Sequence, residues 1–202
     1  LSPTTGDAGA CAKALRALDA ARELERTRSW WRSYVGSLQT VVTPDPLLNY
    51  LYIRSVVYGK MHEKPSCIIA SIRFYLYCWI RDSSEISRAF TRLGDRSLAQ
   101  THFRFHAKVQ DAAGFWWAHY HTNGVPSWDI LEMCEPPYAA TSLWEYYRRT
   151  KDLDTVRRYY PMAKKASEFM LRESRKNDDR LIFALNDDNT GPHTHGGVFQ
   201  RF

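Results

Sequence analysis

Two pairs of segments with helical periodicity, each joined by a short charged turn, constrain the fold of this chain more than any other feature. The pairs cover residues 82–110 and 138–174, with joints at Asp95 and Asp152. The joints lie 57 residues apart, beyond the period of tetratricopeptide or ankyrin repeats. Long loops between antiparallel pairs favour an all-α fold, a toroid of helical hairpins whose inner mouths carry the site. Because six such pairs would need roughly 350 residues, we expect this chain to form only part of a toroid.

Two further helices are expected before these pairs. Residues 7–36 carry apolar side chains near helical spacing and predict one lead-in helix. Residues 47–61, which follow Pro44-Asp45-Pro46, predict a second helix with one buried face. The sequence therefore divides into a lead-in segment, 1–40, and one larger domain, 41–202.

The segments between the helices carry their own signals. Residues 64–79 predict irregular extended chain, and the aromatic, aperiodic residues 114–128 predict a loop. Asp82, with Glu85 three residues later, has the pattern of a helix N-cap. Pro161 is expected to kink or interrupt the last helix.

Hydropathy and charge argue against two classes of partner. The mean hydropathy is −0.49, and the apolar stretches are too short to span a bilayer, so no membrane role is expected. The net charge is +6, but the cations stand among acids, as in residues 148–152 and 164–168. This mixture indicates solvated helix faces rather than a groove for nucleic acid.

The cysteines, the first residues and the histidines give three further expectations, and none of them predicts a cofactor. The four cysteines lie far apart with no C-x-x-C pair, so reduced thiols are expected. No signal peptide is visible after Leu1, and the cytoplasm is the favoured compartment. His102, His106 and two H-x-H pairs raise the question of zinc, but H-E-x-x-H is absent and no metal site is predicted.

The strongest motif is Y-L-Y-C-W-I-R-D at residues 75–82, which resembles the Y-x-Y-x-W-x-R-D signature of glycoside hydrolase family fifteen, the glucoamylases and their relatives. Other blocks resemble the family in the same order: I-I-A-S, the first hairpin turn, the N-G…S-W loop and a stretch closing in L-W-E-Y-Y. Together the blocks cover roughly residues 30–195. The resemblance implies a partial (α/α)6 catalytic barrel over residues 41–202. Its reaction would be inverting hydrolysis that releases terminal glucose from α-linked glucose.

The resemblance implies a sugar-binding wall around the signature. Tyr77, Trp79, Arg81 and Asp82 would bind the substrate, with Arg81 and Asp82 holding hydroxyls of the non-reducing terminal glucose. Arginine offers a rigid fork of donors and aspartate only acceptors, so the pair can fix several hydroxyls of one ring. The alternative for Asp82 is that it only caps its helix.

Three more residues fall on substrate-binding positions of the family pattern. Trp128 matches the S-W loop that places a ring against the substrate, and the alternative role is plain packing of the loop. Glu132 and Glu135 match the Q and E of Q-x-D-E, where Cys134 departs from the expected Asp. Glu135 could otherwise be the N-cap of the helix that Pro136 opens.

The catalytic assignment departs from the family. Asp187 and Asp188 occupy the positions of two glutamates, the first of which is the general acid of the family. Inversion needs a second carboxylate, about 6.5–9.5 Å from the acid, to activate water. The base of the family lies beyond Phe202, so we expect the longer protein to be the enzyme and this chain to be inactive. As an alternative, residues 186–190 form only a solvated turn.

Three functions stay open on these grounds. The first is a glucoamylase-like enzyme acting on α-glucan or malto-oligosaccharide, and the second is a trehalase of the same family, which would share the same wall. The third is a carbohydrate-binding or helical scaffold remnant without catalysis, favoured by the two aspartates and the missing base.

Overall fold

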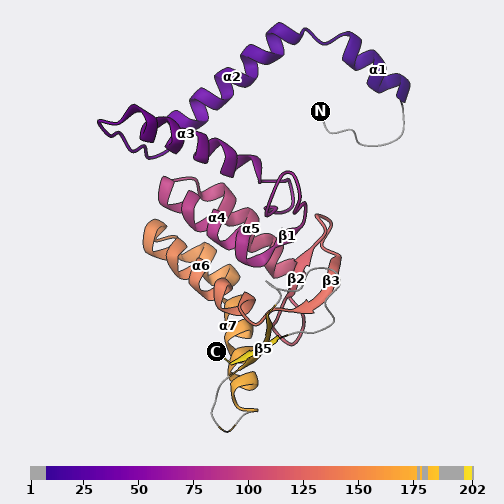
Figure 1. The fold of residues 1–202 in the computed structure, drawn as a ribbon, viewed down its shortest axis with the longest axis vertical. Helices are drawn as coiled ribbons and strands as arrows, with labels where there is room; N and C mark the ends of the chain where they lie inside the picture. The colour runs from indigo at the N-terminus through magenta and orange to yellow at the C-terminus, as the bar shows by residue number, and fades with distance from the viewer. Residues whose placement is uncertain (1–7, 177, 179–181, 187–197, 202) are drawn as a thin grey trace.

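The computed structural model describes residues 8–176, 178, 182–186 and 198–201. These residues form a mainly helical protein with a small sheet at one end of the helices (Figure 1). The helices are α1 (Ala8–Arg16), α2 (Ala20–Gly36), α3 (Pro46–Met61), α4 (Ile80–Leu93), α5 (Arg96–Val109), α6 (Glu135–Thr150) and α7 (Leu153–Ser174). The strands are β1 (Cys78–Trp79), β2 (Trp117–Tyr120), β3 (Pro126–Leu131), β4 (Phe183–Asn186) and β5 (Val198–Arg201).

The two helical hairpins are confirmed, and local capping explains them. Gly94 ends α4 in the left-handed conformation, and the Asp95 side chain accepts from the Ser97 amide to begin α5. At the second joint, Lys151 takes the left-handed conformation and Asp152 caps α7. The all-α expectation therefore holds for the main part of the fold.

The hairpins stack in layers, with α3 above α4 and α5, and α6 and α7 below them (Figure 1). The largest core lies between the two hairpins, where the rings of Phe103 and Tyr146 meet edge to face with centroids 5.5 Å apart. A smaller core joins α3 to the first hairpin through Val56, Phe90 and Leu98. These cores fix α4 between α3 and α6.

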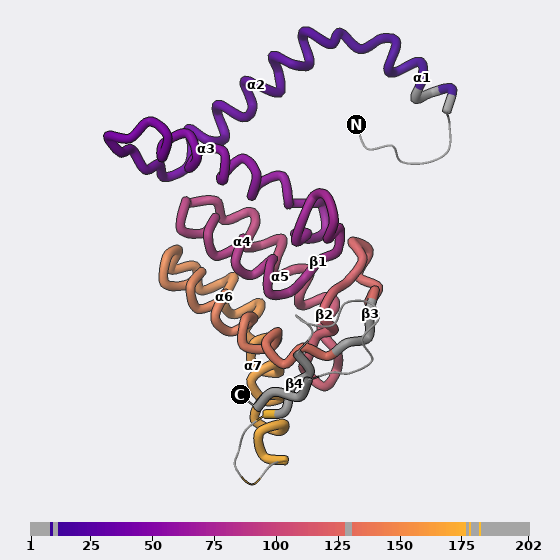
Figure 2. Tube along the Cα trace, in the orientation of Figure 1, coloured from indigo at the N-terminus to yellow at the C-terminus, as the bar shows by residue number. Residues whose placement is uncertain are grey.

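The lead-in segment differs from the expected single helix. Asp19 accepts hydrogen bonds from the amides of Ala21 and Arg22, so it starts a new helix and divides the segment into α1 and α2. Both helices extend away from the stacked hairpins (Figure 2). Attachment begins at the end of α2, where the Tyr34 hydroxyl donates to Asp95 Oδ2 over 2.6 Å, and continues at Gln39, whose amide donates to the Leu93 carbonyl. The proposed boundary at residue 40 stays a prediction.

Two expectations about helix boundaries are wrong. α4 begins at Ile80 and its N-cap position is Trp79, so Asp82 lies inside the first turn and does not cap the helix. α7 continues through Pro161 without a break. An exposed proline removes one backbone hydrogen bond but can stay in a helix whose opposite face is well packed, and Ala163 and Ala166 provide that packing.

The expected loop over residues 114–128 instead contains β2 and the start of β3. β1, β2 and β3 form an antiparallel sheet in the order β1-β2-β3. Ala118, His119 and Tyr120 are all buried, Tyr120 belongs to the main core, and Trp117 is partly buried and packs against that core. β2 therefore has no alternation of buried and exposed residues that would distinguish it from an aromatic loop in the sequence. A second, two-stranded sheet pairs β4 with β5.

A disulfide joins Cys67 to Cys78, so the expectation of reduced thiols is wrong for this pair. Both residues are buried in the main core, and the bond ties the chain before β1 to the start of the site described below. No helix in the described ranges is long and apolar enough to cross a membrane.

Reduction of this disulfide should lower stability at neutral pH. The bond closes a short loop, with a sequence separation of 11 residues, and such a constraint on the unfolded chain contributes about 2–3 kcal/mol. Urea unfolding of the oxidised protein and of the Cys67→Ala/Cys78→Ala variant measures the difference. Thiol titration of the denatured chain checks the bond itself, because reduction should expose two additional thiols. An unchanged thiol count would contradict the disulfide.

Candidate functional site

One face of the three-stranded sheet carries a row of aromatic rings. The register pairs Trp79 with His119, and the ring centroids of these two residues lie 4.3 Å apart. Tyr77 packs against His119 at 5.0 Å and against His121 at 5.2 Å. Alternate residues of adjacent strands share a face, which explains why these four rings gather.

His119 and His121 are the site residues that sequence reasoning missed. In the sequence, H-x-H spacing indicates a zinc pattern, or histidines that hydrogen-bond sugar hydroxyls or cap loops, whereas in extended chain it places both rings on one face. His119 lies in β2, and His121 follows its end directly. The Nδ1 atom of His119 also forms a hydrogen bond with the Ser127 hydroxyl of β3. The expected role of Trp128 stays a prediction: its backbone pairs with His119, and its side chain lies outside the described part of the structure.

Arg81 and Asp82 follow this aromatic face directly, in the first turn of α4. Both side chains are partly exposed. The Arg81 Nη1 lies 3.8 Å from the Glu132 Oε2 and 3.7 Å from the Cys134 Sγ. The charge of Asp82 acts on His62 and on Glu135, which places it between the end of α3 and the start of α6. The first turn of α4 thus brings one donor fork and one carboxylate to the edge of the sheet.

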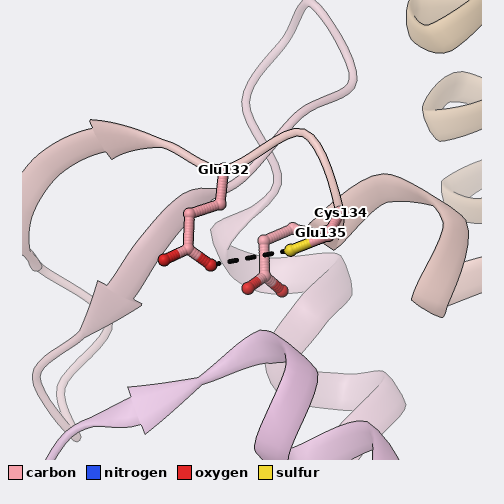
Figure 3. Close-up of side chains that lie close together, drawn as sticks. All are labelled: Glu132, Cys134 and Glu135. Atoms are coloured by element: carbon pink, nitrogen blue, oxygen red, sulfur yellow. Dashed lines mark hydrogen bonds between the residues drawn. The ribbon is translucent and has the colours of Figure 1, made fainter. Parts of the chain in front are cut away.

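Glu132, Cys134 and Glu135 form a cluster where β3 passes into α6 (Figure 3), within reach of Arg81. One ligand-type atom from each residue lies within 4.8 Å of the others. The Cys134 thiol donates to Glu132 Oε2 over 3.7 Å. Both glutamates are buried, and Glu135 is fully inaccessible. Cys134, not Glu135, occupies the N-cap position of α6, so the capping alternative for Glu135 is wrong.

Burial dominates the titration of this cluster. It raises the pKa of Glu135 well above its ordinary value, and the neighbouring Glu132 carboxylate raises it further while Arg81 opposes the shift. Burial and then the charges of Glu135 and Glu132 raise the pKa of the Cys134 thiol to about 12. At neutral pH the thiol therefore keeps its proton, and a nucleophilic role for Cys134 is not supported.

The expected site residues fall into three groups. Tyr77, Trp79, Arg81 and Asp82 lie together at the junction of β1 and α4, and Glu132 and Glu135 stand behind Arg81. Their roles toward a ligand stay predictions. Asp187 and Asp188, the expected catalytic pair, lie outside the described residues.

A comparison with known proteins found a distant relative. The chain is 28% identical, over 153 residues, to an uncharacterized glycosyl hydrolase of Methanocaldococcus jannaschii. The match covers 70% of this chain and 24% of that protein, so the chain spans about a quarter of the length of its relative. No family model matches the chain, and no solved structure matches it.

Proposed function

We propose that this chain carries part of the sugar-binding wall of a glycoside hydrolase. The observation that supports this most directly is the aromatic face formed by Tyr77, Trp79 and His119 beside the Arg81 fork and the Asp82 carboxylate. Flat rings pack on the apolar faces of pyranose rings, and a donor fork with an acceptor pair can fix the hydroxyls at the rim. The similarity to a glycosyl hydrolase supports the same conclusion.

The finer proposal is that the substrate is α-linked glucose, as in glucoamylases. It depends on the Y-x-Y-x-W-x-R-D motif, whose five named residues lie around the junction of β1 and α4. A trehalase remains the second candidate, because it would use the same wall. A carbohydrate-binding remnant is the third, since the two aspartates in place of glutamates still stand against catalysis.

An exposed groove supports the proposal of a larger ring of hairpins. It lies along α6 and α7, has a volume of about 560 Å³, and is lined largely by apolar side chains, including Leu143, Trp144, Tyr160 and Leu171. Three of these are more than half exposed. The first hairpin covers the other side of α6, so a third hairpin, supplied by a longer polypeptide of the relative's length, would cover this groove in the same way.

Arg81→Ala should weaken the binding of maltotriose and trehalose to the purified chain at least tenfold. A charge-assisted hydrogen bond contributes about 1.5–3 kcal/mol. Isothermal titration calorimetry measures the change. Arg88→Ala is the matched control, because Arg88 lies two turns along the same helix and pairs with Glu85. Equal affinities for the Arg81 variant and the wild type would reject the proposed wall.

Asp82→Asn tests the other half of the pair. Asn keeps the shape of the side chain but loses the charge and two acceptor sites, so sugar affinity should fall by about tenfold. Because Asp82 does not cap α4, the melting temperature should change little. Calorimetry and thermal unfolding separate the two effects, and a loss of stability without a loss of affinity would assign Asp82 a structural role.

A further inference from the structure

We propose that Glu132, Cys134 and Glu135 form a binding site for a divalent cation of the zinc class, separate from the sugar-binding face. Three ligand-type atoms converge there within 4.8 Å of one another, from two oxygen ligands and one sulfur ligand (Figure 3). Zinc binds carboxylate oxygen at about 2.0–2.2 Å and thiolate sulfur at about 2.3 Å. Movements on the order of 1 Å would bring the three atoms to those distances, and water would complete a tetrahedron.

The carboxylate of Glu135 is the second, independent reason for a ligand at this place. The side chain is fully buried, and among the described residues no donor group gives either of its oxygens a hydrogen bond. Its carboxyl group lies within hydrogen-bonding reach of that of Glu132, which raises its pKa through this contact and through its charge. Arg81 lies 3.8 Å from Glu132 and can balance one of the two charges, so the second needs either a shared proton or a further cation.

The start of α6 explains why the backbone does not satisfy these carboxylates. Carboxylates near a helix N-terminus usually accept hydrogen bonds from the free amides of the first turn. Here Pro136 and Pro137 occupy two of those positions, and proline has no N–H. The first turn of α6 therefore has fewer free N–H donors than usual for these carboxylates. A bound cation can stabilise their negative charge in place of the missing donors.

The cysteine favours a cation over a shared proton. A proton between two carboxyl groups needs no third group, whereas the Cys134 sulfur is turned toward the same point and contacts Glu132 over 3.7 Å. Sulfur selects zinc-class cations over magnesium or calcium, which prefer oxygen alone. Cys134 is exposed as a residue, which gives the ion a path from solvent. Binding would release the thiol proton, and any proton held by Glu135, to solvent as the metal bonds form.

Arg81 would stabilise the metal-bound form from outside. Its Nη1 lies 3.7 Å from the Cys134 Sγ and can donate to the thiolate. Such donors around a site are ordinary partners of metal ligands. The ion would also fix the loop between β3 and α6 against the first turn of α4.

The test uses the whole purified chain with Zn²⁺ and Co²⁺ as probes. Zinc-loaded, dialysed protein should retain one equivalent of metal, and Co²⁺ should produce the near-ultraviolet absorption of a thiolate ligand. Cys134→Ser should abolish that absorption, and Glu135→Gln should weaken binding at least tenfold, since changes to outer partners alone cost about that much. Cys11→Ser, a change of a cysteine far from the cluster in the sequence, is the matched control and should bind like the wild type.

The outcomes are distinct. Circular dichroism and the melting temperature establish that each variant is folded. Wild-type protein that retains no zinc and gives no thiolate absorption with Co²⁺ overturns the site in favour of a shared proton. A Glu135→Gln variant that binds Co²⁺ as tightly as the wild type also overturns it. Neither readout depends on sugar binding.

Discussion

Lowering the pH from 7.5 to 4.5 should unfold this protein, because it buries two histidines in their neutral form. His102 and His106 lie one turn apart on α5, both fully buried, with ring centroids 3.6 Å apart. Their imidazoles lie within hydrogen-bond distance of the Ser83 and Ser84 hydroxyls on α4. Burial lowers the pKa of His102 to about 3, and burial together with the neighbouring His102 lowers that of His106 well below its ordinary value.

The direction of the effect follows from proton binding. Above about pH 6.5 both histidines are neutral in the folded and the unfolded chain, so they do not change stability. Below it the unfolded chain binds protons that the folded chain cannot, and each histidine costs about 1.4 kcal/mol per pH unit. The loss continues down to the folded pKa, which is about 3 for His102. At pH 4.5, about two units below the unfolded pKa, His102 alone costs roughly 3 kcal/mol, and His106 adds to that loss, which is a large part of the stability of many domains.

Urea unfolding at several pH values measures this loss. The free energy of unfolding of the wild type should fall steeply between pH 6.5 and 4.5. His102→Gln or His106→Gln should each lower the slope of that free energy against pH by the contribution of about one proton. His121→Gln is the control, because His121 is exposed to water in the folded chain. If the double variant loses stability as steeply as the wild type, the buried pair does not cause acid unfolding.

Gly114→Ala should be among the most destabilising single substitutions outside the candidate site. Gly114 has φ +106, which places it in the region that favours glycine. A Cβ there would lie 2.3 Å from the Lys165 carbonyl oxygen and 3.2 Å from the Cβ of Phe169. Left-handed strain costs about 1–2 kcal/mol, and overpacking adds about 1–3 kcal/mol. The expected total is about 2–5 kcal/mol, because the turn after α5 would have to move away from α7.

Gly94→Ala is the matched control. Gly94 also has a positive φ, +98, but an added Cβ would meet nothing within 4 Å. It should therefore cost only the strain, about 1–2 kcal/mol. Equilibrium unfolding in urea at neutral pH compares the two variants. Equal losses would mean that the close approach of Gly114 to α7 has no energetic consequence.

The parts of the fold that the sequence predicted correctly depend on short-range interactions. The two hairpin joints carry their own signals, an aspartate N-cap at Asp95 and Asp152 after a left-handed residue, and these act within a few residues. The same reasoning found α3 after Asp45, whose side chain accepts from the Leu47 amide. It failed at Asp19, whose cap divides the lead-in segment into two helices, and at Asp82, which lies inside α4 rather than at its cap.

What the sequence could not predict depends on contacts between distant segments. The strands at residues 117–120 and 126–131 depend on pairing, of β2 with Cys78 and Trp79 and of β3 with β2. α4 follows β1 directly, so its start lies ahead of Asp82. The disulfide has the same origin, since spacing alone does not reveal which cysteines approach each other.

The candidate site shows the same division. The motif located Arg81 and Asp82, because neighbours in sequence stay neighbours in the first turn of a helix. Only tertiary packing brought Arg81 to Cys134, 53 residues along the chain, and stacked His119 on Trp79. Local sequence determined which helices form, because caps and periodicity act over single turns. The packing of α4 against α6, and of β2 against β1, decided which side chains share a site, because those distances depend on the whole fold.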